Sequence, residues 1–302
     1  MDQSLTLPAP ATIVKRPAPW FVVLFVLAAN TWHGTARAQE IVNLEVAAGI
    51  RANAAHWGRG TARPAVVIVH GLYQTYSFPT VTRLAETLAE AGHSVLTPNL
   101  SLRVSDRRQS LACDAIHAHE LGADSREIGV WVDWLRSRGH AEVVLIGHSF
   151  GSLNVLKFME GKPQQGVSRL ILLSLIDPRV ETERPGFLAL RGAASARMGR
   201  RAESLFRYRL SFCDRLVATP ESFLSYADWT VADLLKLLSI PGVGVDVIMA
   251  GDDGRVGPDW AERLAAGGAN ATVIPGADHF FDASHEFELH DTVLSMLSGE
   301  RN

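Results

Sequence analysis

A serine between two glycines is the first residue whose surroundings predict chemistry. Ser149 is the centre of the segment G-H-S-F-G, residues 147–151, with the apolar run Glu142–Ile146 before it and a helical pattern after it. The glycines permit a sharp strand-to-helix turn that presents a serine hydroxyl above the strand ends, beside the positive end of the helix. This context predicts a nucleophilic Ser149 and disfavours a simple helix-capping serine.

A nucleophilic serine needs a base that accepts its proton, and His279 is the best-placed histidine. It follows the predicted strand Ala271–Ile274 and precedes the last predicted helix. A loop in that position brings an imidazole to the edge of the sheet where Ser149 is expected. We therefore predict His279 to be the general base.

The other histidines show no metal-binding pattern. His117 and His119 form H-x-H in a predicted loop, and His285 and His290 lie on the last helix without i, i+4 spacing. No cysteine or third ligand joins them at a recognisable spacing, so no metal site is predicted. These four histidines are expected at the surface or at helix caps.

A carboxylate should orient His279 and stabilise its protonated form. The predicted strand Asp246–Ala250 leads into G-D-D-G-R-V, residues 251–256. Asp253 is preferred, because a residue further into the turn clears the strand end better than its neighbour. Asp252 remains open, and Asp177, after the strand Leu170–Leu175, is the third possibility.

An oxyanion intermediate needs two backbone N–H donors. One should come from Phe150, the residue after the nucleophile. The other should come from the loop H-G-L-Y, residues 70–73, after the first central strand. Leu72 is the predicted donor, with Tyr73 as a possible further contributor.

The elements that must position these residues alternate along the chain. The run Pro64–Gly71 is β-branched without polar alternation, as in a parallel strand buried on both faces. Helical patterns follow most of the strands, which predicts an α/β fold with a mostly parallel sheet covered on both faces. Beyond the strands above, we expect an antiparallel edge hairpin from Ile41–Val46 and Ile50–Trp57, a strand at His93–Thr97, a helix capped by Asp124 and Glu127, and a last helix near Ser284–Leu297 that buries Phe287, Val293, Leu294 and Leu297.

Residues 181–240 interrupt this alternation. The segment is rich in arginine and aromatic residues and has a helical character. A structureless loop of that length is unusual in a compact domain, so a small helical cap over one end of the sheet is predicted. Plain packing helices with a solvated basic face are the alternative.

The first residues resemble a targeting segment. Lys15 and Arg16 precede the apolar run Trp20–Ala29, and an A-R-A sequence ends at Ala38. This pattern predicts a secretory signal peptide over residues 1–38, a mature domain over residues 39–302, and a periplasmic or secreted protein. The apolar run is shorter than a membrane-spanning helix, although an uncleaved anchor is the alternative.

Two cysteines, Cys113 and Cys213, lie in the predicted mature domain. In an oxidising compartment an isolated pair favours a disulfide, and closing so long a loop stabilises by up to ~4 to 5 kcal/mol in the chain-entropy model. Two buried free thiols are the alternative.

Composition excludes two classes of protein. The chain has 302 residues, 47% hydrophobic, with 29 Lys+Arg against 32 Asp+Glu and a net charge of -3. A nucleic-acid-binding protein would have a basic excess, and a disordered chain would have few aliphatic residues. A globular protein with no nucleic-acid partner is predicted.

Over roughly Glu40–Leu297 the sequence resembles the α/β-hydrolase superfamily. The resemblance rests on H-G-L-Y, G-H-S-F-G, the acidic turn at 251–254 and A-D-H-F-F at 277–281, in the order nucleophile, acid, histidine. It implies an eight-stranded, mostly parallel sheet, acyl transfer through an acyl-serine, and no cofactor. One position departs from the family, because Gly254 occupies the usual place of the acid.

The leading hypothesis is therefore an exported serine hydrolase that cleaves a carboxylic ester or thioester of a small-molecule or lipid-like acyl substrate. The signal peptide would give only transient contact with a membrane. A non-catalytic protein that binds a ligand in the same cleft is one alternative, and an amide or peptide hydrolase with the same three residues is another.

Overall fold

The computed structural model describes residues 39–302 except 59, 161–165, 200–203, 283 and 300–302. The predicted signal peptide, residues 1–38, lies outside the described residues. The described residues belong to one compact unit. None of the helices in its described part is long and apolar enough to cross a membrane.

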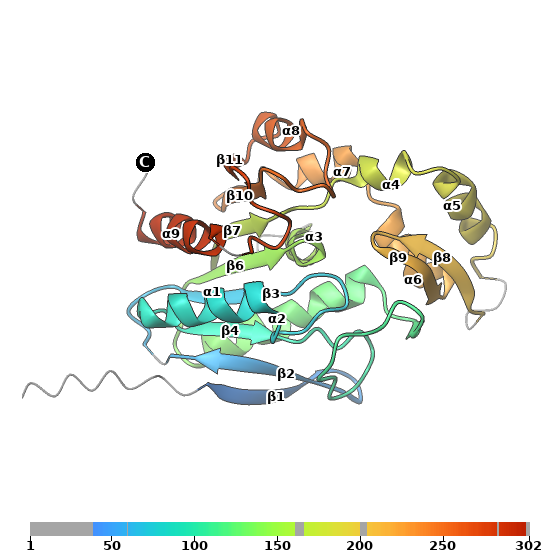
Figure 1. The fold of residues 1–302 in the computed structure, drawn as a ribbon. Helices are drawn as coiled ribbons and strands as arrows, with labels where there is room; N and C mark the ends of the chain where they lie inside the picture. The colour runs from blue at the N-terminus through green and yellow to red at the C-terminus, as the bar shows by residue number, and fades with distance from the viewer. Residues whose placement is uncertain (1–38, 59, 161–165, 200–203, 283, 300–302) are drawn as a thin grey trace, which may run out of the picture. The chain divides into compact units, whose positions relative to one another are not determined.

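An eight-stranded, mostly parallel sheet forms the centre of the domain, as predicted (Figure 1). Its strand order is β1-β2-β4-β3-β6-β7-β10-β11. β1 and β2 form the predicted antiparallel edge hairpin, and β2 is also antiparallel to β4. The strands are β1 (Glu40–Ala47), β2 (Ile50–Trp57), β3 (Ala65–Val69), β4 (Val95–Pro98), β6 (Val143–His148), β7 (Val167–Leu173), β10 (Gly244–Ala250) and β11 (Asn270–Ile274).

Helices cover both faces of this sheet. All five side chains of β3 are buried, and they alternate between two apolar clusters: Val67 and Val69 belong to one, Val66 and Ile68 to the other. This alternation is why a central parallel strand is apolar at every position. One face carries α1 (Pro79–Glu90) and α9 (His285–Ser298), and the other carries α2 (Leu121–Ser137), α3 (Phe150–Met159) and α8 (Trp260–Ala266).

One position of the last helix differs from the sequence expectation, whereas Val293 is buried and Leu294 and Leu297 pack against the same apolar cluster. Leu289 and Val293 are buried under α9, but the Phe287 side chain is 72% exposed. The buried positions follow each other at intervals of four, so Phe287 falls on the opposite side of the helix. The expected burial of Phe287 is therefore wrong.

The segment predicted to be a helical cap contains both helices and strands. Its strands β8 (Phe206–Leu210) and β9 (Cys213–Ala218) form an antiparallel hairpin, which β5 (Ile116–His117) extends to three strands. Tyr208 and Leu210 are buried on one side of β8, with Arg209 between them. Its helices are α4 (Pro178–Thr182), α5 (Phe187–Ser195), α6 (Pro220–Ala227) and α7 (Val231–Lys236).

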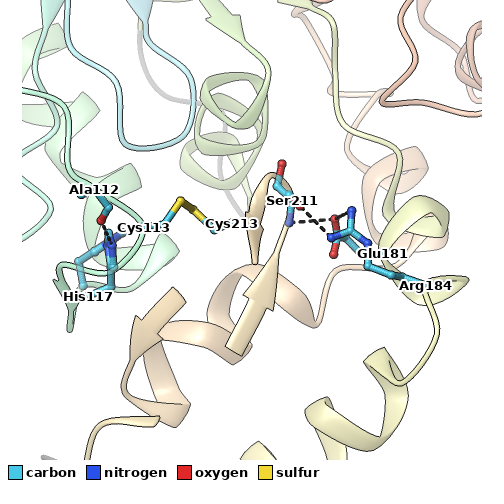
Figure 2. Close-up of a disulfide and its surroundings, with 8 residues drawn as sticks. Ala112, Cys113, His117, Glu181, Arg184, Ser211 and Cys213 are labelled. Atoms are coloured by element: carbon cyan, nitrogen blue, oxygen red, sulfur yellow. Dashed lines mark hydrogen bonds and ion pairs between the residues drawn. A yellow bond between two sulfur atoms is a disulfide. The ribbon is translucent and has the colours of Figure 1, made fainter. Parts of the chain in front are cut away.

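A disulfide joins this insertion to the main domain. Cys113, in the segment before α2, is bonded to Cys213 at the start of β9, across a sequence separation of 100 residues (Figure 2). The predicted pairing is confirmed, and no free cysteine remains. On the far side of the hairpin turn, Glu181 accepts a hydrogen bond from the Ser211 N–H and forms an ion pair with Arg184.

Candidate active site

Ser149 lies in a strained turn between β6 and α3. Its φ of 57° and ψ of -123° place a non-glycine residue in a conformation that costs energy. The flanking glycines allow close packing there. A Cβ at Gly147 would lie 2.5 Å from the backbone of Ser152, and one at Gly151 would lie 2.3 Å from the Val69 carbonyl oxygen. The turn therefore excludes side chains on both sides of Ser149.

Three of the predicted residues form a continuous hydrogen-bonded chain. His279 Nε2 lies 3.0 Å from Ser149 Oγ, and His279 Nδ1 lies 2.7 Å from Asp253 Oδ2. Ser149 follows β6, Asp253 follows β10, and His279 follows β11, so all three come from carboxyl ends of strands in one sheet. All three residues are buried.

The structure distinguishes among the three candidate acids. Asp253 is the one whose side chain contacts His279. Asp252 is exposed. Asp177 is buried in a different arrangement, because its carboxylate pairs with Arg179 and accepts the Gly257 N–H. Gly254 occupies the usual family position of the acid, and a Cβ built there would have no atom within 4 Å.

Asp253 is held as a carboxylate. Burial opposes its ionisation, but the hydrogen bond and charge of His279, with the Arg255 N–H, outweigh burial and lower the Asp253 pKa. The Arg255 N–H donates to Asp253 Oδ1 at 2.9 Å. Both carboxylate oxygens are therefore engaged, one of them with the imidazole.

The predicted oxyanion donors have free N–H groups. Among the residues that the structure describes, no acceptor is hydrogen-bonded to the backbone N–H of Leu72, Tyr73 or Phe150. The Gly71 N–H, by contrast, is occupied, because it donates to Gln74 Oε1. These free donors are consistent with the prediction for Leu72 and Phe150.

A buried histidine and arginine hold the loop that carries Leu72. Burial and the nearby Arg107 lower the His70 pKa to about 3, so its imidazole is neutral. Its Nδ1 donates to the Gly71 carbonyl, and its Nε2 accepts from the Leu100 N–H and from Arg107. Arg107 also donates to the Gln74 carbonyl. Sequence reasoning missed this support, although His70 lies within the H-G-L-Y segment.

His148 was also missed, although it lies inside the G-H-S-F-G motif. It is fully buried, and burial, followed by the charge of His279, lowers its pKa to about 4. The neutral ring places its Nε2 2.9 Å from the His279 carbonyl oxygen, so Nε2–H donates to that oxygen. His148 thus ties the backbone of His279 to the turn that carries Ser149.

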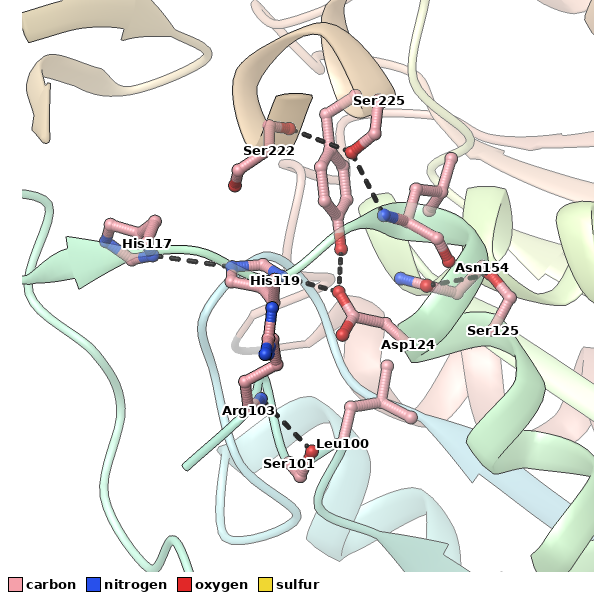
Figure 3. Close-up of polar contacts among 12 residues, drawn as sticks. Leu100, Ser101, Arg103, His117, His119, Asp124, Ser125, Asn154, Ser222 and Ser225 are labelled. Atoms are coloured by element: carbon pink, nitrogen blue, oxygen red, sulfur yellow. Dashed lines mark hydrogen bonds and ion pairs between the residues drawn. The ribbon is translucent and has the colours of Figure 1, made fainter. Parts of the chain in front are cut away.

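A second histidine–aspartate pair lies inside the protein, where the sequence predicted surface histidines (Figure 3). His119 Nδ1 lies 2.5 Å from Asp124 Oδ2, and the Tyr226 hydroxyl donates to the same oxygen. His117 contacts His119 and stacks on the Tyr73 ring, 4.1 Å between centroids. Both histidines are buried, so their expected surface positions are wrong.

Asp124 does not cap α2, contrary to the sequence expectation. The helix begins three residues earlier, at Leu121. Asp124 is therefore in the first turn and faces the protein interior, where it contacts Tyr226 of α6 in the insertion. The acidic residue that resembled a cap instead joins the main domain to the insertion.

A narrow cavity opens onto Ser149 and His279. The centres of water-sized molecules can occupy about 40 Å³ of it. Its apolar lining comes mainly from the insertion and from the strand ends: Phe150, Ile176, Val180, Leu210, Trp229 and Val256. Among the described residues, no group of three His, Cys, Asp or Glu side chains is arranged to hold a metal ion.

Comparisons identify what the chain is similar to. The alpha/beta hydrolase family model matches residues 66–291. No curated protein matches the sequence significantly.

Solved structures share the fold at low sequence identity. Est1E from Butyrivibrio proteoclasticus is 18% identical, with a TM-score of 0.60, and the match covers 86% of this chain and 99% of that one. The siderophore hydrolase EstB from Aspergillus fumigatus is 18% identical, with a TM-score of 0.60 and coverage of 89% and 99%. A thioesterase domain from the curacin biosynthetic pathway is 16% identical, with a TM-score of 0.56 and coverage of 86% and 99%.

Proposed function

Because the chain belongs to the alpha/beta hydrolase family, we propose that it is a serine hydrolase that cleaves a carboxylic ester or thioester through an acyl-Ser149 intermediate. The observation that carries the proposal is the chain of hydrogen bonds from Ser149 through His279 to Asp253. A nucleophile, a base and an orienting acid within hydrogen-bond reach are the parts that acyl transfer requires.

The mechanism follows from these contacts. His279 Nε2 accepts the proton of the Ser149 hydroxyl as Oγ attacks the substrate carbonyl carbon. Asp253 holds the Nδ1–H tautomer and stabilises the imidazolium. The N–H groups of Leu72 and Phe150 stabilise the tetrahedral oxyanion. His279 then protonates the leaving alcohol or thiol, and a water molecule, activated in the same way, releases the acid from Ser149.

The cavity supports a small substrate. Space for about three water molecules beside Ser149 suits a short acyl group better than a long one. The fold, which is shared with a siderophore hydrolase and a thioesterase domain, is compatible with either leaving group. We propose a small-molecule ester or thioester, with no cofactor.

The location of the enzyme is a second part of the proposal. The charged and apolar pattern of residues 1–38 is typical of a signal peptide. The disulfide between Cys113 and Cys213 suits an oxidising compartment. Both observations support export to the periplasm or the medium.

A fluorophosphonate probe tests the proposed nucleophile. The wild-type protein should be labelled on the peptide that contains Ser149, and Ser149→Ala should not be labelled. Ser211→Ala is the matched control, because Ser211 lines the same cavity, and it should keep the label. Folded wild-type protein that resists the probe would contradict the hydrolase and favour a protein that only binds ligands in this cleft. Parallel assays with an ester, a thioester and an amide then separate the three chemistries.

A further inference from the structure

The charged side chains around the cavity are paired, with one exception. Asp177 is bonded to Arg179, which also pairs with Asp259. Glu181 is bonded to Arg184 and to the Ser211 N–H. Among the lining residues, the remaining charged side chain outside the Ser149–His279–Asp253 chain is Arg255.

Arg255 forms no close ion pair in the part of the chain that the structure describes, and its guanidinium donates no hydrogen bond there, although its charge helps to lower the Asp253 pKa. Aromatic rings hold it instead. Its Cζ lies 4.8 Å from the centroid of the Phe280 ring and 5.9 Å from that of Phe212. Phe280 follows His279 directly, and Phe212 lies in the turn between β8 and β9. The guanidinium is therefore held between the loop of the base and the insertion.

Stacking of this kind fixes a guanidinium without using its N–H groups. The attraction to a ring acts through the faces of the two planes, so the in-plane donors stay available. A planar fork of free donors matches a carboxylate, which it can bind with two parallel hydrogen bonds.

We infer that Arg255 binds a carboxylate of the substrate, an inference that rests on the proposed function. The preferred substrate is then a short ester or thioester with an acidic group. Arg255 is then a specificity-determining residue of the same site. The carboxylate lies at the exposed rim where the Arg255 side chain sits, and the scissile carbonyl lies at Ser149.

Two pairs of esters test this inference and locate the acidic group. Mono-4-nitrophenyl glutarate and 4-nitrophenyl pentanoate differ mainly in a carboxylate at the end of the acyl chain. 4-Acetoxybenzoate and its methyl ester differ in a carboxylate on the leaving group. For each pair, the ratio of kcat/KM for the anionic ester to that for the neutral ester is measured, after subtraction of spontaneous hydrolysis.

Wild-type enzyme should prefer the anionic member of one pair by about 2- to 5-fold, the range expected of an ion pair near solvent. The pair that shows the preference tells whether Arg255 contacts the acyl or the leaving part. Arg255→Met should bring the ratio close to 1, Arg255→Lys should keep part of the preference, and Arg255→Glu should reverse it. The preference should also fall as salt is raised, in the wild type and not in Arg255→Met.

Arg138→Met is the matched control. Arg138 is also exposed and stacked on an aromatic ring, Trp134 at 3.7 Å, but it does not line the cavity. Its loss should leave the ratio at the wild-type value. A ratio unchanged by both Arg255→Met and Arg255→Glu overturns the inference while the hydrolase stands. Failure of folded wild-type enzyme to hydrolyse any of the four esters overturns the proposed function, and the inference with it.

Discussion

The molecule contains two buried histidine–aspartate pairs, and they differ in what lies beyond the imidazole. In one, Asp253 holds His279 Nδ1 at 2.7 Å and His279 Nε2 reaches the Ser149 hydroxyl. In the other, Asp124 holds His119 Nδ1 at 2.5 Å, but His119 Nε2 faces His117.

The comparison shows that a carboxylate–imidazole pair is not by itself a catalytic device. The Asp253 pair ends at a hydroxyl that lines a cavity. The Asp124 pair lies inside the protein, where Asp124 also accepts a hydrogen bond from Tyr226 of the insertion. A substrate can reach the first pair and not the second, so we expect the first to control kcat and the second to control stability.

The largest effect should come from the two residues that exchange a proton. Ser149→Ala and His279→Ala should each lower kcat by about 10⁴- to 10⁶-fold, and the double variant should lose little more, because the residues act as a unit. Steady-state kinetics with an activated ester measures all three. If the fold-losses of the two single variants multiplied in the double variant, the two side chains would not share a mechanism.

Removing the charge of the first pair should have the next largest effect. Asp253→Asn should leave the fold intact but lower kcat by up to about 10⁴-fold, since an amide can hold the wrong tautomer and cannot balance an imidazolium. Asp252→Asn and Asp177→Asn are the comparison variants and should lower kcat far less. A large loss confined to Asp177→Asn would assign the acid to the residue after β7 instead.

Removal of the disulfide should lower stability by up to about 4.7 kcal/mol, the chain-entropy value for a loop of about 100 residues. The double variant Cys113→Ala/Cys213→Ala tests this by urea unfolding, with oxidised wild-type protein as the comparison. KM should rise as well, because Leu210 and Ser211 beside the bridge line the cavity. A stability difference below about 1 kcal/mol would contradict the expected constraint on the unfolded chain.

The charge of the second pair should affect stability more than rate. Asp124→Asn should lower the free energy of unfolding by about 1 to 3 kcal/mol, because the buried partners His119 and Tyr226 lose a charged acceptor. Its kcat should change by less than about tenfold, since neither partner contacts the reacting atoms. A loss of kcat as large as that of Asp253→Asn, in folded protein, would remove the distinction between the two pairs.

The smallest effect is a pH dependence next to the second pair. Burial raises the Glu127 pKa to about 7, against hydrogen bonds from Ser101 that lower it. A carboxyl with a raised folded-state pKa binds its proton more tightly when folded, so its contribution to stability falls as pH rises from about 4.5 to about 7. The urea midpoint of the wild type should fall more steeply with pH over that range than the midpoint of Glu127→Gln. Parallel curves would show that Glu127 does not titrate differently on folding.

The sheet and the first pair could be predicted because their signals are local. Buried parallel strands are apolar at every position, as in β3, and the residues after three strand ends must meet at one edge of the sheet. Ser149, Asp253 and His279 each directly follow such a strand or lie in the loop after it. The choice of Asp253 over Asp252 needed only the geometry of one turn.

The burial of the second pair could not be predicted, because it depends on a contact with the insertion, although His119 and Asp124 themselves are only five residues apart. Asp124 and Tyr226 are 102 residues apart, and the short H-x-H segment has no periodicity that separates burial from exposure. An early acidic residue also resembles a helix cap, and nothing in the local sequence shows that α2 begins at Leu121.

The β8–β9 hairpin is a different case, because the sequence does contain a strand pattern there. The segment F-R-Y-R-L, residues 206–210, alternates strictly between apolar residues and arginine, which is the pattern of a half-buried strand. The abundance of arginine and the surrounding helical segments favoured a purely helical cap. The alternation over these five residues indicates the strand β8 correctly, whereas the abundance of arginine does not.

The disulfide also determines what a protease could separate. The bridge between Cys113 and Cys213 encloses Ser149 but leaves Asp253 and His279 outside the loop. A single cut anywhere between the two cysteines would leave two polypeptides joined by one covalent bond. The nucleophile and its base would then remain in one molecule after the chain itself had been broken.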